Sequence, residues 1–130
     1  MTDNKMLPEE LMLELKKWAV IGANQNPEKF GNMIYNKLKR KGYTVYPVNP
    51  VYKDIDGDPC YASLADLPEI PEVLNMVVSP KRTKLFLQEA HKLGIKNIWL
   101  QPGTFDDEVL AMLKEFDMNA VQACVLVATR

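Results

Sequence analysis

The sequence has little cysteine and no long apolar run. Its only cysteines are Cys60 and Cys124, whereas small secreted disulfide scaffolds usually carry more. No apolar stretch approaches the roughly 20 residues that span a bilayer. The start, from Met1 to Met12, shows no basic segment followed by an apolar run, so no signal peptide is predicted. These absences argue against a disulfide scaffold or a membrane-spanning chain, and we expect a reducing, cytoplasmic location.

Neither sign of charge is in excess. The 16 basic and 17 acidic residues give a formal net charge of -1, which favours neither a nucleic acid nor an anionic membrane as a partner. Hydrophobic residues make up 47% and charged residues 25%, as in ordinary globular proteins. The length suits one domain, which we place at residues 1–130, with 1–16 as an N-terminal helical extension.

The sequence also lacks a recognisable catalytic or metal-binding set. His91 is the only histidine and lies late in a predicted helix, where a cation is favourable without any function. Neither cysteine has a CxxC partner or a clustered histidine, and no nucleophile, base and acid stand at a recognisable spacing. The sequence therefore predicts neither catalytic residues nor a metal site.

Short apolar runs alternate with helical segments along most of the chain, which is typical of parallel βαβ units. Strands are predicted at 18–21, 44–48, 73–78, 97–100 and 120–127. We expect an α/β fold: a doubly wound, parallel, Rossmann-like sheet of about five strands with helices on both faces. The predicted strand order is 3-2-1-4-5, numbered along the chain, and 51–71 is expected to be irregular apart from a short turn capped by Ser63.

Ligands of such sheets bind beyond the carboxyl ends of the strands. After the first strand comes a loop from Gly22 to Gly31 that leads into a helix, so free backbone N–H groups and the helix dipole favour an anion there. Lys29 adds a positive charge that suits a phosphate. Lys53, Lys81 and Arg82 are further basic residues expected near the strand tips, where solvated surface charges explain each of them at least as well. The loop is not a dinucleotide fingerprint, because Asn24 replaces the second glycine and Asn49 stands where a ribose-binding acid is expected. An NAD(P)-linked enzyme or sensor is therefore the alternative.

The second strand ends in a proline-rich segment, Pro47-Val48-Asn49-Pro50, and the third in Val78-Ser79-Pro80. Proline fixes the backbone and removes a hydrogen-bond donor. Rigid walls with few donors suit the flat face of an adenine, although for the first segment taken alone a strand that simply stops at a proline turn is the better explanation.

Taken together, these segments resemble a known family. The matching stretches are 20–24 with Pro27 and Gly31, 46–50, and 98–103, which reads Ile-Trp-Leu-Gln-Pro-Gly. They resemble the small, stand-alone CoA-binding proteins, which are similar to the CoA-binding Rossmann domain of the succinyl-CoA synthetase alpha subunit. The synthetase activity is not implied, because His91 does not match its phosphorylated histidine.

The resemblance implies coenzyme A as the ligand, lying across the strand tips. The pyrophosphate would rest on the first loop, the adenine between the tips of the second and third strands, and the pantetheine near Gln101 and Gly103. The predicted binding residues are Gly22, Ala23, Asn24, Pro27, Lys29, Phe30, Gly31, Pro47, Val48, Asn49, Pro50, Val78, Ser79, Pro80, Gln101 and Gly103.

Two further hypotheses stay open. The chain is also consistent with a regulatory subunit that binds a protein partner or a second copy of itself, because fold alone does not decide function. In addition, Cys60 or Cys124 is a candidate for a mixed disulfide with the thiol of coenzyme A.

Overall fold

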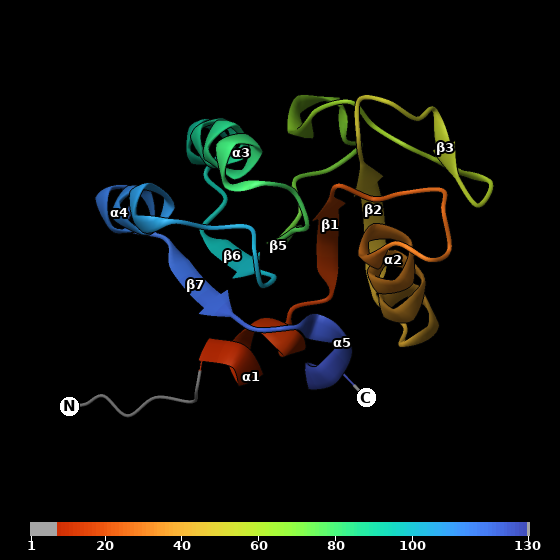
Figure 1. Cartoon of the computed structure of the whole chain (residues 1–130), viewed down its shortest axis with the longest axis horizontal. Coiled ribbons are helices and arrows are strands. Elements are labelled where there is room, and N and C mark those ends of the chain that lie inside the picture. Colours follow the sequence, from red (N-terminus) through yellow and green to blue (C-terminus); the bar gives the residue numbers. More distant parts are fainter. Residues whose placement is uncertain (1–7, 130) are drawn as a thin grey trace.

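A five-stranded parallel sheet forms the centre of the computed structural model, which describes residues 8–129 (Figure 1). Its order is β2-β1-β5-β6-β7, and every neighbouring pair is parallel. The strands are β1 (Lys17–Ile21), β2 (Thr44–Val48), β5 (Val73–Met76), β6 (Asn97–Leu100) and β7 (Asn119–Gln122). The central strands are buried because both faces of the sheet are covered, which explains why they read as unbroken apolar runs.

Helices cover the two faces in separate groups (Figure 1). They are α1 (Pro8–Glu14), α2 (Phe30–Arg40), α3 (Pro80–Leu93), α4 (Asp107–Glu115) and α5 (Val125–Ala128). Helices α3 and α4 pack on the face that carries Ala19 and Ile21, whereas α1, α2 and α5 pack on the face that carries Trp18 and Val20. Alternate residues of β1 thus enter different cores, as the two-residue period of a strand requires. Between residues 8 and 129, no helix combines the length and apolar character needed to cross a membrane.

The crossover from β2 to β5 contains a small hairpin and a helical turn. Strands β3 (Asp54–Ile55) and β4 (Asp58–Pro59) pair antiparallel, and the turn η1 (Leu64–Asp66) follows. Asp56 and Gly57 connect the two strands with positive φ values of 51° and 87°, the pattern that two-residue hairpins favour. The short turn after Ser63 is confirmed, but the Ser63 hydroxyl donates to the Asp66 carboxylate and does not cap the backbone. The hairpin lies in the segment predicted to be irregular.

The doubly wound class and the five parallel strands are confirmed, but the predicted order 3-2-1-4-5 is wrong. The observed order is 2-1-3-4-5 when the same five strands are counted, so β5 pairs with β1 instead of lying outside β2. The outer edge of β2 is not open to another strand of the sheet. Pro47 has no N–H to donate, and its carbonyl accepts the Tyr61 N–H at 3.0 Å. Proline is typical of edge strands.

The ends of the chain differ from the prediction in two ways. The opening helix is present as α1, and residues 1–7 of the predicted extension lie outside the described residues. The last predicted strand, 120–127, stops at Gln122, and its second half forms α5. The Val125 N–H donates to Oε1 of Gln101 at 2.8 Å, which turns the backbone away from the sheet. A short apolar run fits a buried strand or a buried helix equally well.

Candidate ligand-binding site at the strand tips

The chain reverses its direction of travel across the sheet at β1. It passes from β1 to β2 on one side and later returns to β5 on the other side. In open α/β sheets, ligands bind in the crevice beyond the strand ends at such a switch point. The corrected order therefore places the loop after β1 between the tips of β2 and β5.

Two glycines allow this loop to fold tightly against the sheet. Gly22 has φ +100°, and a Cβ atom there would stand 2.7 Å from the carbonyl oxygen of Val77. At Gly31, a Cβ would stand only 2.1 Å from the carbonyl oxygen of Gly22. The start of α2 thus lies directly on the end of β1, and any side chain at Gly31 would force the two apart.

The loop keeps backbone donors available for an anion. The N–H of Gly22 donates to the Val48 carbonyl, but within residues 8–129 no acceptor is found for the N–H groups of Ala23, Phe30 and Gly31. The last two are free because they begin α2, where the first N–H groups have no partner within the helix. Free N–H groups at a helix start favour phosphate.

The two asparagines of the site are occupied in holding the loop. Nδ2 of Asn49 donates to the Ala23 carbonyl at 2.8 Å, and its Oδ1 accepts the Val51 N–H. Asn49 is nearly buried, so it ties the tip of β2 to the loop after β1. The Oδ1 of Asn24 accepts the Asn26 N–H at 2.8 Å, an internal turn of the loop.

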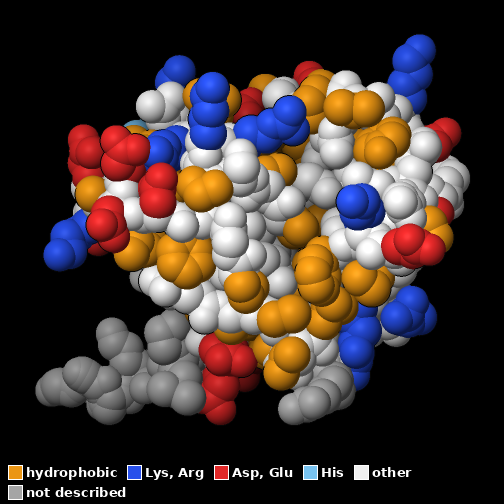
Figure 2. Space-filling view, viewed as in Figure 1, with side chains coloured by type: hydrophobic (Ala, Val, Ile, Leu, Met, Phe, Trp, Pro, Cys, Tyr) orange, Lys and Arg blue, Asp and Glu red, His pale blue; other side chains and the backbone are white. Residues whose placement is uncertain are grey.

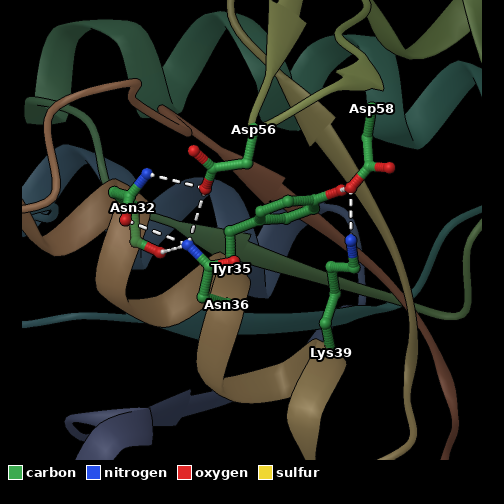
Figure 3. A network of polar contacts seen from close by, with 6 residues as sticks. All are labelled: Asn32, Tyr35, Asn36, Lys39, Asp56 and Asp58. Carbon is green, nitrogen blue, oxygen red and sulfur yellow. Dashed lines mark hydrogen bonds and ion pairs between the residues drawn. The ribbon is translucent and has the colours of Figure 1, made fainter.

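A polar network braces the loop against the β3–β4 hairpin (Figure 3). One carboxylate oxygen of Asp56 accepts Nδ2 of both Asn32 and Asn36, at 3.2 and 2.8 Å. The same Nδ2 of Asn32 donates to the carbonyl of Asn24 at 2.9 Å. Nearby, Gln25 donates to the backbone carbonyl of Asp54. The hairpin is therefore connected to the loop both directly and through α2.

A second part of this network involves Tyr35, Lys39 and Asp58 (Figure 3). The Asp58 carboxylate accepts the Tyr35 hydroxyl at 2.6 Å and forms an ion pair with Lys39. The hydrogen bond from Lys39, followed by that from Tyr35, lowers the pKa of Asp58. Burial, followed by the hydrogen bond to Asp58, raises the pKa of Tyr35. Both shifts keep this contact intact at neutral pH.

An apolar hollow at the tips, the switch-point cavity, has a volume of about 340 Å³. The tip of β2 forms one wall, and the first turns of α3 form the other. It is lined by Gly22, Val48, Asn49, Pro50, Ala62, Ser63, Val78, Arg82, Leu85, Phe86 and Glu89. Apolar walls with a few polar groups are typical of sites for small organic ligands.

A more polar hollow, the loop cavity, adjoins it over the loop after β1. Its volume is about 360 Å³, and it shares Gly22, Asn49, Val78 and Arg82 with the switch-point cavity. Its remaining lining residues are Asn24, Val77 and Ser79. The two cavities therefore form one continuous site, apolar at one end and polar at the end where the loop lies.

A third hollow, the Cys124 cavity, lies beyond the tips of β5 and β6. Its volume is about 280 Å³, and it shares Val77 with the loop cavity. It is lined by Phe30, Val77, Val78, Gln101, Pro102, Gly103, Thr104 and Cys124. Val78 lines all three cavities, so they form a row along the strand tips.

The two thiols have different environments. Burial raises the pKa of Cys60, whose Sγ donates to the Asn49 carbonyl. At Cys124, burial acts in the same direction, but the Gln101 side chain and the N–H groups of Val127 and Leu126 outweigh it, so the pKa is lowered. Cys124 is thus the more acidic thiol, and it lines the third of these cavities.

The structure gathers ten of the sixteen predicted residues around these cavities. They are Gly22, Asn24, Phe30, Val48, Asn49, Pro50, Val78, Ser79, Gln101 and Gly103. The other six line none of the three: Ala23, Pro27, Lys29, Gly31, Pro47 and Pro80. Pro47 lies instead in a hollow on the outer edge of β2, and the His91 ring stacks on Phe116 at 4.1 Å, away from these linings.

The predicted binding residues leave out one wall of the switch-point cavity, although Arg82 was expected among the basic residues near the strand tips. Arg82, Leu85, Phe86 and Glu89 all lie on α3 and all line this cavity. Their spacing of three, four and seven residues places them on one face of a helix. That spacing begins just after the tip of the third predicted strand, and it could have predicted a helix face turned toward the site.

Charge is mixed on the face shown in Figure 2. Acidic and basic side chains are interspersed near its margins, and hydrophobic side chains run across its middle. At the start of α4, Asp106 and Glu108 both pair with Lys84 of α3. A cation that has no such partner is therefore a candidate to bind an anionic ligand at this site.

Known proteins resemble the chain over most of its length. The ADP-forming acetate–CoA ligase I of Archaeoglobus fulgidus is 37% identical over 78 residues, which are 60% of this chain and 11% of the ligase. The chain thus spans only about a tenth of that relative. The uncharacterized protein YneT of Bacillus subtilis is 24% identical over 121 residues, 92% of this chain and 90% of YneT.

A solved structure shares the fold. A conserved hypothetical protein from Pyrococcus furiosus superposes with a TM-score of 0.82 and 38% identity, covering 88% of this chain and 99% of that one. The model of the CoA binding domain family matches residues 16–130. With its doubly wound sheet, glycine-bounded loop and cavities at the strand tips, this chain belongs to the CoA binding domain family.

Proposed function

We propose that this chain binds coenzyme A across the strand tips and performs no catalytic step itself. The observation that carries the proposal is the tight contact of Gly31 with Gly22, which presents free backbone N–H groups next to the polar loop cavity. Such donors suit a pyrophosphate. Family membership supports the same ligand.

The row of cavities matches the order of groups in coenzyme A. The apolar switch-point cavity suits the adenine, because Val48, Pro50 and Phe86 offer apolar walls. The loop cavity then takes the pyrophosphate. The pantetheine arm extends past Val78 toward Gln101 and Cys124, where its thiol would lie. Free coenzyme A and an acyl ester fit this proposal equally.

Calorimetric titration of the purified protein tests the proposal, with NAD and ATP as comparison ligands. We expect binding of coenzyme A in the micromolar range and weaker binding of the other two. Heat with NAD but none with coenzyme A up to about 1 mM, a concentration that detects even weak affinity, would contradict the proposal and favour the alternative of a redox protein.

Chemical-shift perturbation in the isotope-labelled protein tests the position of the ligand. We expect the largest amide shifts in 22–31, 48–50 and 77–82, with smaller shifts near Gln101. The hollow at the outer edge of β2, which contains Tyr43 and Tyr61, serves as the internal control. Shifts confined to that hollow would show that the ligand binds elsewhere.

A further inference from the structure

Arg82 occupies the junction between two of the cavities. It lines both the apolar switch-point cavity and the polar loop cavity. Among the residues that the structure describes, no other lysine or arginine lines either of them. It lies in the first turn of α3, two residues after Pro80.

Arg82 forms no ion pair within the described part of the chain. No carboxylate or other acceptor is bonded to its guanidinium there. Lys84 on the same helix is held by Asp106 and Glu108, and Lys39 is held by Asp58. The cation at the junction is thus available to a ligand, whereas that of Lys84 on the same helix is paired with two carboxylates.

The acid of the same cavity is already engaged. Glu89 lines the switch-point cavity on α3, seven residues after Arg82. Its two carboxylate oxygens accept the N–H groups of Leu64 and Ala65, at 3.2 and 3.1 Å. Its role is therefore to hold the η1 turn, and the guanidinium remains open to an anion.

Coenzyme A carries an anion at the corresponding point of its own structure. Its ribose joins the adenine to the pyrophosphate and bears a separate phosphate on the 3′-oxygen. An adenine in the switch-point cavity and a pyrophosphate on the loop place this ribose at the junction of the cavities. Guanidinium groups recognise phosphate with paired hydrogen bonds.

We propose that Arg82 binds the 3′-phosphate of coenzyme A and makes the site prefer coenzyme A to ligands that lack this group. The inference rests on the proposed function, and it adds a specificity-determining residue to it. ADP, NAD and 3′-dephospho-coenzyme A all present an adenosine and a pyrophosphate but leave Arg82 without its partner.

A cycle of two ligands and several variants tests this inference. Coenzyme A and 3′-dephospho-coenzyme A are titrated into the unmodified protein, Arg82→Gln and Arg82→Lys. Lys81→Gln is the matched control, because it removes the same charge from the same helical turn but Lys81 lines none of the three cavities. Thermal unfolding of each variant verifies that the fold is retained.

We expect the unmodified protein to bind coenzyme A at least about 10-fold more tightly than the dephospho form, as for a charge-assisted hydrogen bond. Arg82→Gln should abolish this preference by weakening coenzyme A binding alone. Arg82→Lys should retain part of the preference, and Lys81→Gln should retain all of it.

Three results would overturn the inference. If the unmodified protein binds both ligands equally, or if Arg82→Gln weakens both to the same extent, Arg82 does not recognise the 3′-phosphate, although coenzyme A binding itself stands. If neither ligand binds, the proposed function fails and the inference fails with it.

Discussion

The switch-point cavity and the Cys124 cavity lie on the same row of strand tips but are supported in different ways. The first lies against a loop that is fixed by glycine contacts, by Asn49 and by the hairpin network around Asp56. In the second, Gln101 joins the tip of β6 to the start of α5. The comparison shows that more of the described contacts hold the nucleotide end of the proposed site than its thiol end.

The largest effect is expected from Gly31→Ala. A methyl group there would stand 2.1 Å from the Gly22 carbonyl oxygen, so the loop has to move and its free N–H groups lose their alignment. We expect coenzyme A affinity to fall by at least about 100-fold, equal to about 2.7 kcal/mol, in a calorimetric titration.

Gly42→Ala is the control for that substitution. Gly42 has φ +94° but open space where a Cβ would lie, so it should lose about 1 kcal/mol of stability and keep its affinity for coenzyme A. An affinity for Gly31→Ala within about threefold of the unmodified protein would show that the close contact does not shape the site.

A smaller effect is expected from releasing the hairpin. Asp56→Ala removes the acceptor of Asn32 and Asn36, and Asn32 in turn holds the loop at Asn24. We expect a loss of about 3- to 10-fold in coenzyme A affinity, corresponding to one hydrogen bond.

Asp56→Asn distinguishes this brace from a simple effect of charge. An asparagine retains an oxygen acceptor and tolerates the positive φ of this position, so it should restore most of the affinity. Equal losses in both variants would show that the charge of Asp56 matters more than its hydrogen bonds.

The thiol end gives a third prediction, on reactivity. Because the pKa of Cys124 is lowered and that of Cys60 is raised, Cys124 has the larger thiolate fraction at any pH below both values. We expect it to react several-fold faster with iodoacetamide near pH 7.5, as read by peptide mass mapping, with a pH midpoint below that of Cys60.

Gln101→Leu should reduce this difference, because it removes one of the groups that stabilise the Cys124 thiolate. Coenzyme A disulfide extends the test: attack by the Cys124 thiolate would form a mixed disulfide and release one coenzyme A thiolate. An adduct mapped mainly to Cys60 would reverse the ranking of the two thiols.

The smallest effect is expected at acid pH. The pKa of Asp58 is lowered by its hydrogen bonds from Lys39 and Tyr35, so its contribution to stability is present above its unfolded-state pKa and is lost as the pH falls through the folded-state value. Below about pH 4, we expect faster amide exchange in 54–59 than around Gln101. Asp58→Asn should remove this pH dependence. If exchange in 54–59 does not change as the pH falls, the contacts of Asp58 do not hold the hairpin.

Much of the site could be predicted from local patterns, but the wall that α3 forms could not. Gly22 and Gly31 mark the anion-binding loop because glycine at a strand end and at a helix start has few other uses. Arg82 was expected near the strand tips, but the wall that it forms with Phe86 was not predicted, because α3 meets the loop only after the sheet is ordered. Asn49 was predicted to form an adenine wall, and its additional role as a clamp on Ala23 depends on a contact between residues 26 positions apart.

The sequence by itself determined the alternation of strands and helices, the five-stranded parallel class and the position of the loop, because these follow from periodicity and from the conformations of glycine and proline. Only the tertiary structure decided that β5 lies beside β1, that 125–128 turn into a helix, and that Arg82 reaches the junction of two cavities. Strand pairing depends on which edge is free. In the sequence, Pro47 marks β2 as an edge strand. The partner at that edge is Tyr61, and the crossover that brings Tyr61 there is predicted by no local pattern.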